Sequence, residues 1–155
     1  MAFVVTGLSA EPYTHLYGLS DRELARHGAY RYRADASPGF PDRIEMRDAQ
    51  LGESLLLVNH ASMDQDTPYK TSHAVFVLEG AQESYRADNV IPQVMHRRLL
   101  SLRAFDGAGM MLDAELAEGN AISETVERLL SNTEVDRIHA HYALRGCYAG
   151  LIERV

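Results

Sequence analysis

The sequence predicts an α+β protein: a single domain over residues 1–155, with a mainly antiparallel sheet of about eight strands and two or three short helices. Segments with the apolar pattern of strands recur along the whole chain, whereas few segments have helical spacing. The two kinds of segment do not alternate regularly, which disfavours a doubly wound parallel sheet. A chain of 155 residues is most simply one domain with a core of its own.

The segment 120–132 has the clearest helical pattern in the chain. Its apolar residues fall on one stripe and its polar residues on the opposite side, as expected for a helix that covers a core. The stripe consists of Ile122, Val126, Leu129 and Leu130. A second, shorter helix is expected to begin at Pro92, because proline is well suited to the first turn of a helix.

A further short helix is predicted near the beginning of the chain. Ser20 and Glu23 have the spacing of a capping box, in which each side chain satisfies a backbone N–H of the other residue. Leu19 and Leu24 stand where a hydrophobic staple would form, and Gly28 is a suitable end.

The remaining apolar segments predict strands. Their expected ranges are 2–8, 29–34, 43–48, 54–60, 73–80, 100–106, 135–143 and 146–155, together with 107–119, which is either a strand or an irregular arm. The strands 54–60 and 73–80 are expected to form a hairpin, which would bring His60 and His73 together at the mouth of the loop 61–72. Loops of this length are often functional or mobile.

The charge balance excludes several classes of function. Fifteen basic and 22 acidic residues give a net charge of −7, which disfavours binding to nucleic acid. No apolar run approaches the roughly 20 residues of a membrane span, and the opening residues do not have the pattern of a signal peptide. A single cysteine excludes an internal disulfide. Together, these features lead us to expect a soluble cytoplasmic protein that binds neither nucleic acid nor membrane.

The C-terminal region concentrates reactive side chains in the segment RIHAHYALRGCYAG, from Arg137 to Gly150. On a strand, His139 and His141 would share one face, where two imidazoles could bind a divalent metal with a third ligand from elsewhere. Metal enzymes of the cupin type add a glutamate downstream and a glycine upstream. Here Arg145 and Thr133 stand in those regions, so a metal is an alternative that we do not favour.

Two other features suggest chemistry. Cys147 follows Gly146, and a base such as His141 together with Arg145 could activate it as a nucleophile, although a lone cysteine is more often a buried apolar residue. The arginines Arg97, Arg98 and Arg103 are close together in the sequence and could bind a small anion, or could equally lie on a solvated surface.

The blocks PGFPDRIEMRDAQLGESLLLVNH, TPYKTSHAVFV, LSLRAFDGAGMMLDAEL and IHAHYALRGCYAGLIER resemble a bacterial family named domain of unknown function 1203. The resemblance covers nearly the whole chain, and its most specific parts are RDA-x-x-GE, PY-x-x-S-H and GCYA. It implies a bacterial, single-domain, cytoplasmic protein, and it implies no activity. Asp42 stands where the family pattern has a cysteine, so a thiol pair with Cys147 is not available to this chain; Asp42 could bind a hard metal or cap a turn.

From these features we predict a protein that binds a small anionic molecule and that could be an enzyme. The ligand-binding candidates are Arg47, Tyr69, His73, Arg103 and Arg145, and the catalytic candidates are His139, His141 and Cys147. Arginine binds anions through paired hydrogen bonds, and histidine exchanges protons near neutral pH. The histidine pair His139 and His141 is also the candidate metal site.

An alternative of another class is an interaction module without chemistry. Tyrosines are frequent at interfaces because the side chain is partly apolar and partly polar. An exposed patch of Tyr13, Tyr17, Tyr30 and Tyr32 would then join two copies in a homodimer.

Overall fold

The computed structural model describes residues 2–155. Its strands are β1 (Phe3–Thr6), β2 (Tyr30–Arg33), β3 (Ser54–Met63), β4 (Thr71–Leu78), β5 (Arg86–Asp88), β6 (Leu100–Phe105), β7 (Met111–Ala117), β8 (Arg137–Tyr142) and β9 (Tyr148–Arg154). Its helices are α1 (Asp21–Arg26), α2 (Gln93–His96) and α3 (Ala121–Leu130), with a 3-10 turn η1 (Thr14–Leu16). None of the helices in this described part is long and apolar enough to cross a membrane.

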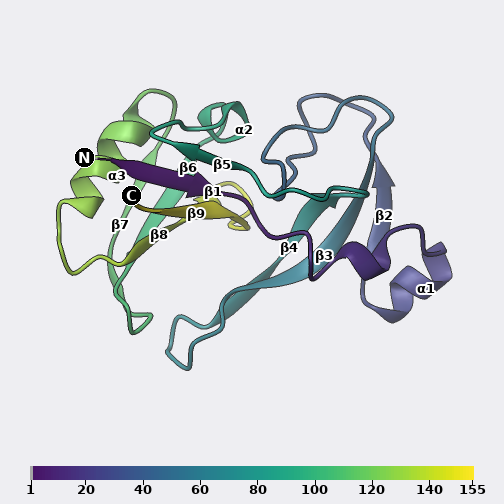
Figure 1. The fold of residues 1–155 in the computed structure, drawn as a ribbon, viewed down its shortest axis with the longest axis horizontal. Helices are drawn as coiled ribbons and strands as arrows, with labels where there is room; N and C mark the ends of the chain where they lie inside the picture. The colour runs from purple at the N-terminus through teal and green to yellow at the C-terminus, as the bar shows by residue number, and fades with distance from the viewer. Residues whose placement is uncertain (1) are drawn as a thin grey trace.

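The strands form two antiparallel sheets, which confirms the α+β class (Figure 1). The large sheet has the order β5-β1-β9-β8-β6-β7, and the small sheet has the order β2-β3-β4. Figure 1 shows α3 and α2 beside the large sheet, and α1 at the far end of the molecule beside the small sheet.

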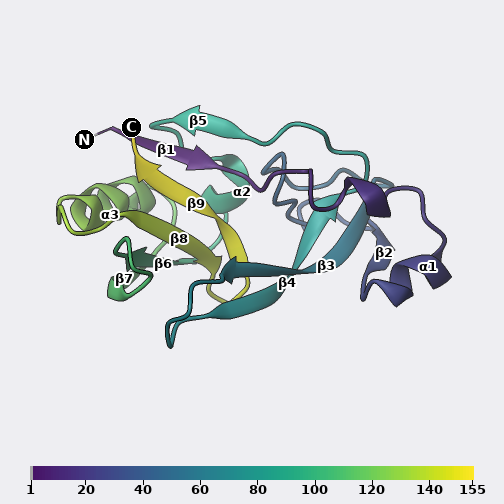
Figure 2. The same cartoon turned by 60° about the horizontal axis from the view of Figure 1, so that its bottom comes forward.

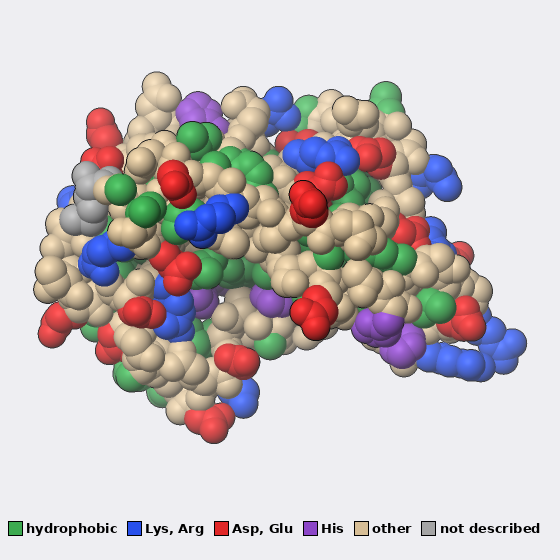
Figure 3. Space-filling view, viewed as in Figure 1, with side chains coloured by type: hydrophobic (Ala, Val, Ile, Leu, Met, Phe, Trp, Pro, Cys, Tyr) green, Lys and Arg blue, Asp and Glu red, His purple; other side chains and the backbone are tan. Residues whose placement is uncertain are grey.

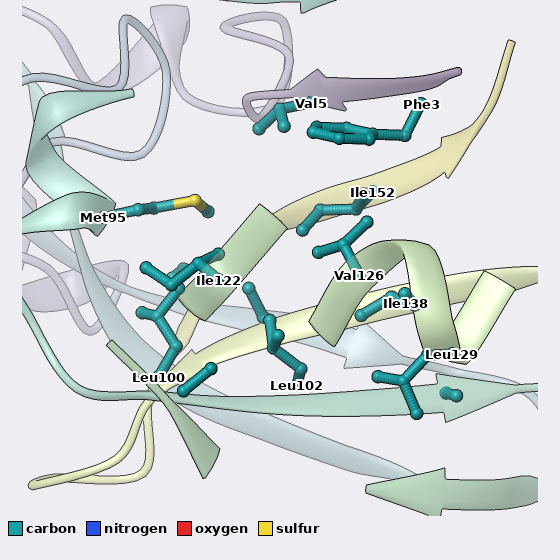
Figure 4. Close-up of a cluster of buried hydrophobic side chains, with 14 of the residues drawn as sticks. Phe3, Val5, Met95, Leu100, Leu102, Ile122, Val126, Leu129, Ile138 and Ile152 are labelled. Atoms are coloured by element: carbon teal, nitrogen blue, oxygen red, sulfur yellow. The ribbon is translucent and has the colours of Figure 1, made fainter. Parts of the chain in front are cut away.

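The main core lies between the helices and one face of the large sheet, which we call the inner face. The stripe predicted on α3 packs there: Ile122 and Val126 are fully buried, and they face Leu102 and Ile138 of the sheet (Figure 4). Burial of one such side chain stabilises the fold by roughly 1.5–3 kcal/mol. The amphipathic pattern of α3 therefore determines which face of the large sheet is left for other contacts.

A second core surrounds the small sheet. Leu55 and Leu56 are adjacent in β3 and both are fully buried, since this end of the strand is covered on both faces. Leu24 of α1 belongs to the same core, and the predicted capping box of Ser20 and Glu23 is present at the start of that helix. The local pattern and the packing thus agree at α1.

The outer part of the β3–β4 hairpin leaves the small sheet and reaches the other face of the large sheet, which we call the outer face. Figure 2 shows this part of the hairpin beside the ends of β8 and β9. β3 is longer than predicted and β4 begins earlier than predicted, so the loop is shorter than the expected 61–72; the register pairs Ala61 with Ser72. His60 and His73 are direct partners across the hairpin, as predicted.

The predicted strand 43–48 is wrong. The segment turns instead: Met46 has a φ of 53°, and only isolated bridges join Pro41 to Asp48 and Asp42 to Phe76. The two apolar residues that suggested a strand lie in this turn and pack into different cores: Ile44 into the core of the small sheet and Met46 into the main core. Asp42 holds this turn, because its carboxylate accepts the backbone N–H of Leu78 at 2.7 Å.

β5 is a strand that the sequence analysis did not predict. The strand has 3 residues, which is too short for an alternating pattern to be recognised. It pairs with β1 at the edge of the large sheet.

Gly7 directly follows β1 and lies against the backbone of the turn at residues 43–46. A substitution at Gly7 therefore tests how closely these two segments pack. A Cβ at Gly7 would stand 2.4 Å from the backbone oxygen of Ile44. We expect Gly7→Ala to lower the free energy of unfolding by about 1–3 kcal/mol, measured by urea denaturation. Gly107→Ala is the control, since nothing lies within 4 Å of a Cβ there; equal stability of the two variants would contradict the close approach.

Candidate functional site

The outer face of the large sheet carries polar side chains where most buried faces are apolar. The register pairs Ser101 with His141, Arg103 with His139 and Phe105 with Arg137 on the neighbouring strands β6 and β8. Because residues opposite each other in a sheet point to the same side, these six side chains share the outer face. The inner-face residues between them, such as Leu102 and Ala140, enter the main core.

The β3–β4 hairpin adds two histidines to this face. The ring of His73 lies 5.2 Å from that of His141, and the ring of His60 lies 5.3 Å from that of Tyr148. Tyr148 also contacts the rings of His139 at 5.5 Å and His141 at 5.8 Å. We call His60, His73, His139 and His141 the histidine cluster. Figure 3 shows histidine side chains inside a hollow near the centre of this view.

The cluster is held neutral near pH 7. The pKa of His139 is lowered to about 4 and that of His141 to about 3, mainly by burial; the guanidinium charge of Arg137 contributes at His139, and that of Arg103 contributes at both rings. Burial also lowers the pKa values of His60 and His73, and Arg103 contributes at His73. The four imidazoles therefore add hydrogen-bonding groups to the site without adding positive charge.

Hydrogen bonds set the orientation of three of these rings. His141 Nδ1 lies 2.8 Å from the backbone oxygen of Gly146, which can only accept, so Nδ1 carries the proton and Nε2 has the free lone pair. His139 Nε2 accepts from Arg137 Nε at 3.3 Å, and the hydroxyl of Tyr13 lies 3.0 Å from His60 Nδ1. The fourth ring differs, because Nδ1 of His73 is buried and has no partner among the described residues.

Arg103 is the unusual cation of the site. Its Nε donates to Ser101 Oγ at 3.1 Å, and none of the ion pairs formed within residues 2–155 includes it. Burial lowers the pKa of its guanidinium, and no carboxylate among the described residues offsets that effect. Its remaining donors are therefore available to an acceptor that the protein itself does not supply.

The structure brings together half of the predicted site residues. His73, Arg103, His139 and His141 meet at the outer face, as described above. Tyr69 lies at the margin: its ring packs on Phe105 at 6.0 Å, and Phe105 packs on His139 at 4.9 Å.

Arg47 and Arg145 do not join these residues. Arg47 forms a bidentate ion pair with Glu53 at 2.7 and 2.9 Å, which lowers the pKa of that carboxyl to about 2. Arg145 is exposed in the turn between β8 and β9. Neither contacts the histidine cluster in the described part of the chain, because Arg47 lies in the turn at residues 43–48 and Arg145 lies beyond the end of β8.

Cys147 also lies apart from the histidines. It packs against the main core, and its Sγ accepts from Nη2 of Arg43 at 3.0 Å. Tyr148, the next residue, points to the outer face instead. No contact between Cys147 and a histidine is present among residues 2–155, so the pairing that a thiol nucleophile needs is not formed.

The three arginines that are close in sequence are separated as well. Arg97 and Arg98 both bind the carboxylate of Asp48, at 3.2 and 2.6 Å, whereas Arg103 lies on the outer face. The hydrogen bonds and charge of Arg98 outweigh burial and lower the pKa of Asp48. The predicted anion site on this arginine group is therefore reduced to Arg103.

The residues that sequence reasoning missed are those that support the cluster. Tyr148 is buried and lies against three histidine rings, and burial raises the pKa of its hydroxyl. Arg43, at the start of the predicted strand 43–48, is only 2% exposed. The position of Tyr148 two residues beyond Gly146 on a short hairpin could have placed it beside His141; nothing in the sequence indicates the burial of Arg43.

The candidate metal site at His139 and His141 gains no third ligand from the part of the chain that the structure describes. Among residues 2–155, no group of three or more histidine, cysteine, aspartate or glutamate side chains is placed to hold a metal ion. Asp42, considered as a ligand from the sequence, uses its carboxylate on the backbone N–H groups of Leu78 and Glu45.

Comparisons with known proteins identify a family but no relative of known activity. Residues 39–154 match the model of a family described as protein of unknown function (DUF1203). A search of the curated proteins and a search of the solved structures found no match to this chain.

The lowered histidine pKa values predict how stability depends on pH. The folded chain binds protons at His139 and His141 less tightly than the unfolded chain, so stability is full above about pH 6.5 and is lost as the pH falls toward 4. Each histidine contributes a slope of at most about 1.4 kcal/mol per pH unit. Urea denaturation between pH 7 and 5 should therefore show a shallower slope for His139→Gln or His141→Gln.

His27→Gln is the control for this measurement, because His27 is exposed. It should leave the slope as in the unmodified chain. If stability depended on pH with the same slope in all the variants, burial of His139 and His141 would not lower their pKa values, and the prediction would be wrong.

Proposed function

We infer the function from the chemistry of the site, because the chain belongs to the DUF1203 family, which is described only as protein of unknown function. We propose that the protein binds a small anionic molecule at the outer face of the large sheet, with Arg103 as the group that holds the anion.

The observation that carries this proposal is the unpaired guanidinium of Arg103. Arg31, Arg47 and Arg98 are all partly buried, and each of them binds a carboxylate of the protein. Arg103 is half-buried, yet its only hydrogen-bond partner among the described residues is the hydroxyl of Ser101. Taking a cation out of water costs free energy unless an acceptor compensates it, and a bound anion would be such an acceptor.

The histidines around Arg103 suit the same ligand. His73 and His141 both lie near enough to Arg103 for its charge to lower their pKa values. A neutral imidazole can donate one hydrogen bond and accept another, so the partly exposed ring of His73, which makes no hydrogen bond within the described residues, has a donor or acceptor to offer through its other nitrogen. The cation and the imidazole together would bind an oxyanion of a carboxylate or a phosphate.

Binding is better supported than proton transfer. A general base works best when its pKa is near the working pH, and those of His139 and His141 lie at about 4 and about 3. Cys147, the third catalytic candidate, is hydrogen-bonded to Arg43 and not to a histidine. We therefore propose a binding protein rather than an enzyme.

A second candidate function is the homodimer, in a form that differs from the one predicted. Tyr30 and Tyr32 are 59% and 42% exposed on β2, the edge strand of the small sheet. Tyr13 is buried, and the hydroxyl of Tyr17 donates to the backbone oxygen of Ala81, so these two do not extend the patch. Light scattering tests this candidate: a dimer that Tyr30→Ser dissociates would support it, and a monomer at all concentrations would exclude it.

We further propose that the protein acts in a bacterial cytoplasm, as the family resemblance implies. The single, partly exposed Cys147 suits a reducing compartment, where it would stay a free thiol. Fractionation of bacterial cells that express the chain is the test, and recovery in the periplasm would contradict this placement.

The anion site can be tested by titration calorimetry with inorganic phosphate, acetate and succinate. We expect at least one of them to bind, and Arg103→Gln to weaken that binding about tenfold or more, because a charge-assisted hydrogen bond contributes about 1.5–3 kcal/mol. Arg145→Gln is the matched control, since Arg145 is exposed and lies outside the site. Equal affinity of Arg103→Gln and the unmodified chain, or no binding of any of the three anions, would overturn the proposal.

A further inference from the structure

The strand beside Arg103 has an apolar side that no part of the described chain covers. The register of β7 with β6 pairs Leu116 with Ser101 and Ala114 with Arg103, so both residues lie on the outer face. Beyond Asp113 the register shifts by one residue, so that Met111 and not Leu112 stands opposite Phe105 of the outer face. Leu116 is 61% exposed, Ala114 is exposed and Met111 is partly exposed. We call Met111, Ala114 and Leu116 the apolar stripe.

The distribution of residues on β7 is the reverse of what packing alone would produce. An edge strand commonly directs apolar residues toward the core and polar residues toward water. On β7 the residues opposite Leu102 and Ala104 of the inner face are Glu115 and Asp113. Glu115 pairs with Arg128 of α3, which places the polar side of the strand toward the helix. The apolar side is therefore directed away from the core and stands next to the unpaired cation.

We propose that the anion held by Arg103 is the head of an amphiphile, a free straight-chain carboxylate whose apolar tail lies along the stripe of β7. This inference rests on the proposed function, since it takes Arg103 as the group that binds the head. The arrangement provides a cation and an adjoining apolar stripe, and no carboxylate of residues 2–155 is paired with the cation. Those are the elements that a molecule with a charged head and an apolar chain requires.

The length of the stripe sets a scale for the tail. Met111 and Leu116 are five residues apart on a strand that rises about 3.3 Å per residue, which gives roughly 16 Å. A tail that grows within this length covers more of the stripe with each methylene. A tail that extends beyond the strand gains nothing further, so the increase in affinity should level off.

A second copy of the chain is a less suitable occupant of this strand. Antiparallel pairing of β7 with its copy, centred on Ala114, would set Asp113 of each chain opposite Glu115 of the other. Like charges directly opposite each other across a strand pair are destabilising. A carboxylate with an alkyl tail covers the stripe without approaching these residues, because they lie on the other face of the sheet.

The experiment is titration calorimetry with acetate, hexanoate and decanoate, each as a monomer in solution. We expect affinity to rise with chain length, by up to about fourfold for each methylene that is fully buried. Leu116→Ser should remove about tenfold of the affinity for decanoate and leave acetate unchanged, whereas Arg103→Gln should weaken all three. Leu144→Ser is the matched control, because Leu144 is 96% exposed in a turn away from β7.

The outcomes separate the two proposals. Affinity that depends on Arg103 but not on chain length would overturn the amphiphile and leave the anion site standing. Affinity that rises with chain length but is unaffected by Arg103→Gln would overturn both. Light scattering on the same samples covers the remaining occupant: a dimer that Leu116→Ser dissociates would show that the stripe is a contact between copies, which also overturns the amphiphile.

Discussion

The arrangement of the two sheets depends on the hydrogen bonds made by the buried guanidinium of Arg43. Nε donates to the backbone oxygen of Tyr148 at 2.9 Å, Nη1 to that of Pro41 at 2.6 Å, and Nη2 to Cys147 Sγ. The guanidinium also stacks 4.9 Å from the ring of Tyr142. One side chain thus joins the start of β9 in the large sheet to the turn that leads into the small sheet. Burial lowers the pKa of this guanidinium, so its hydrogen bonds compensate an unfavourable placement.

Asp42, the residue before Arg43, completes this connection from the other side. Its carboxylate binds the backbone of Leu78 at the end of β4, and burial raises its pKa while the backbone hydrogen bonds oppose that rise. The hairpin β3–β4 therefore has a fixed direction relative to β9. That direction brings His60 and His73 over Tyr148 and His141, so the histidine cluster depends on a turn that contains none of its members.

The sequence predicted the features that are set locally. The stripe of α3, the capping box of α1 and the pairing of His60 with His73 all follow from short-range spacing, and all are present. The turn at residues 43–48 was mistaken for a strand, because its backbone is held by long-range hydrogen bonds that leave no periodic trace. The same limit applies to the site. Alternation on β8 placed His139 and His141 together, whereas no local pattern shows that Arg47 would pair with Glu53, or that Cys147 and Tyr148 would point to opposite faces of the sheet.

The pairing of the first strand with the last has a consequence for how this chain folds. β1 and β9 are neighbours in the middle of the large sheet, with Phe3 opposite Arg154, and Figure 1 shows the two chain ends side by side. The sheet therefore depends on contacts between residues that are separated by almost the whole sequence. Such topologies fold slowly, because the entropy of closing a long loop is lost before the strands gain their contacts. During synthesis on the ribosome, β1 cannot pair until β9 has been made. Until then, the inner-face residues of β6 and β8 are not fully buried. The interval between synthesis and sheet closure is thus the period in which this protein is most exposed to aggregation.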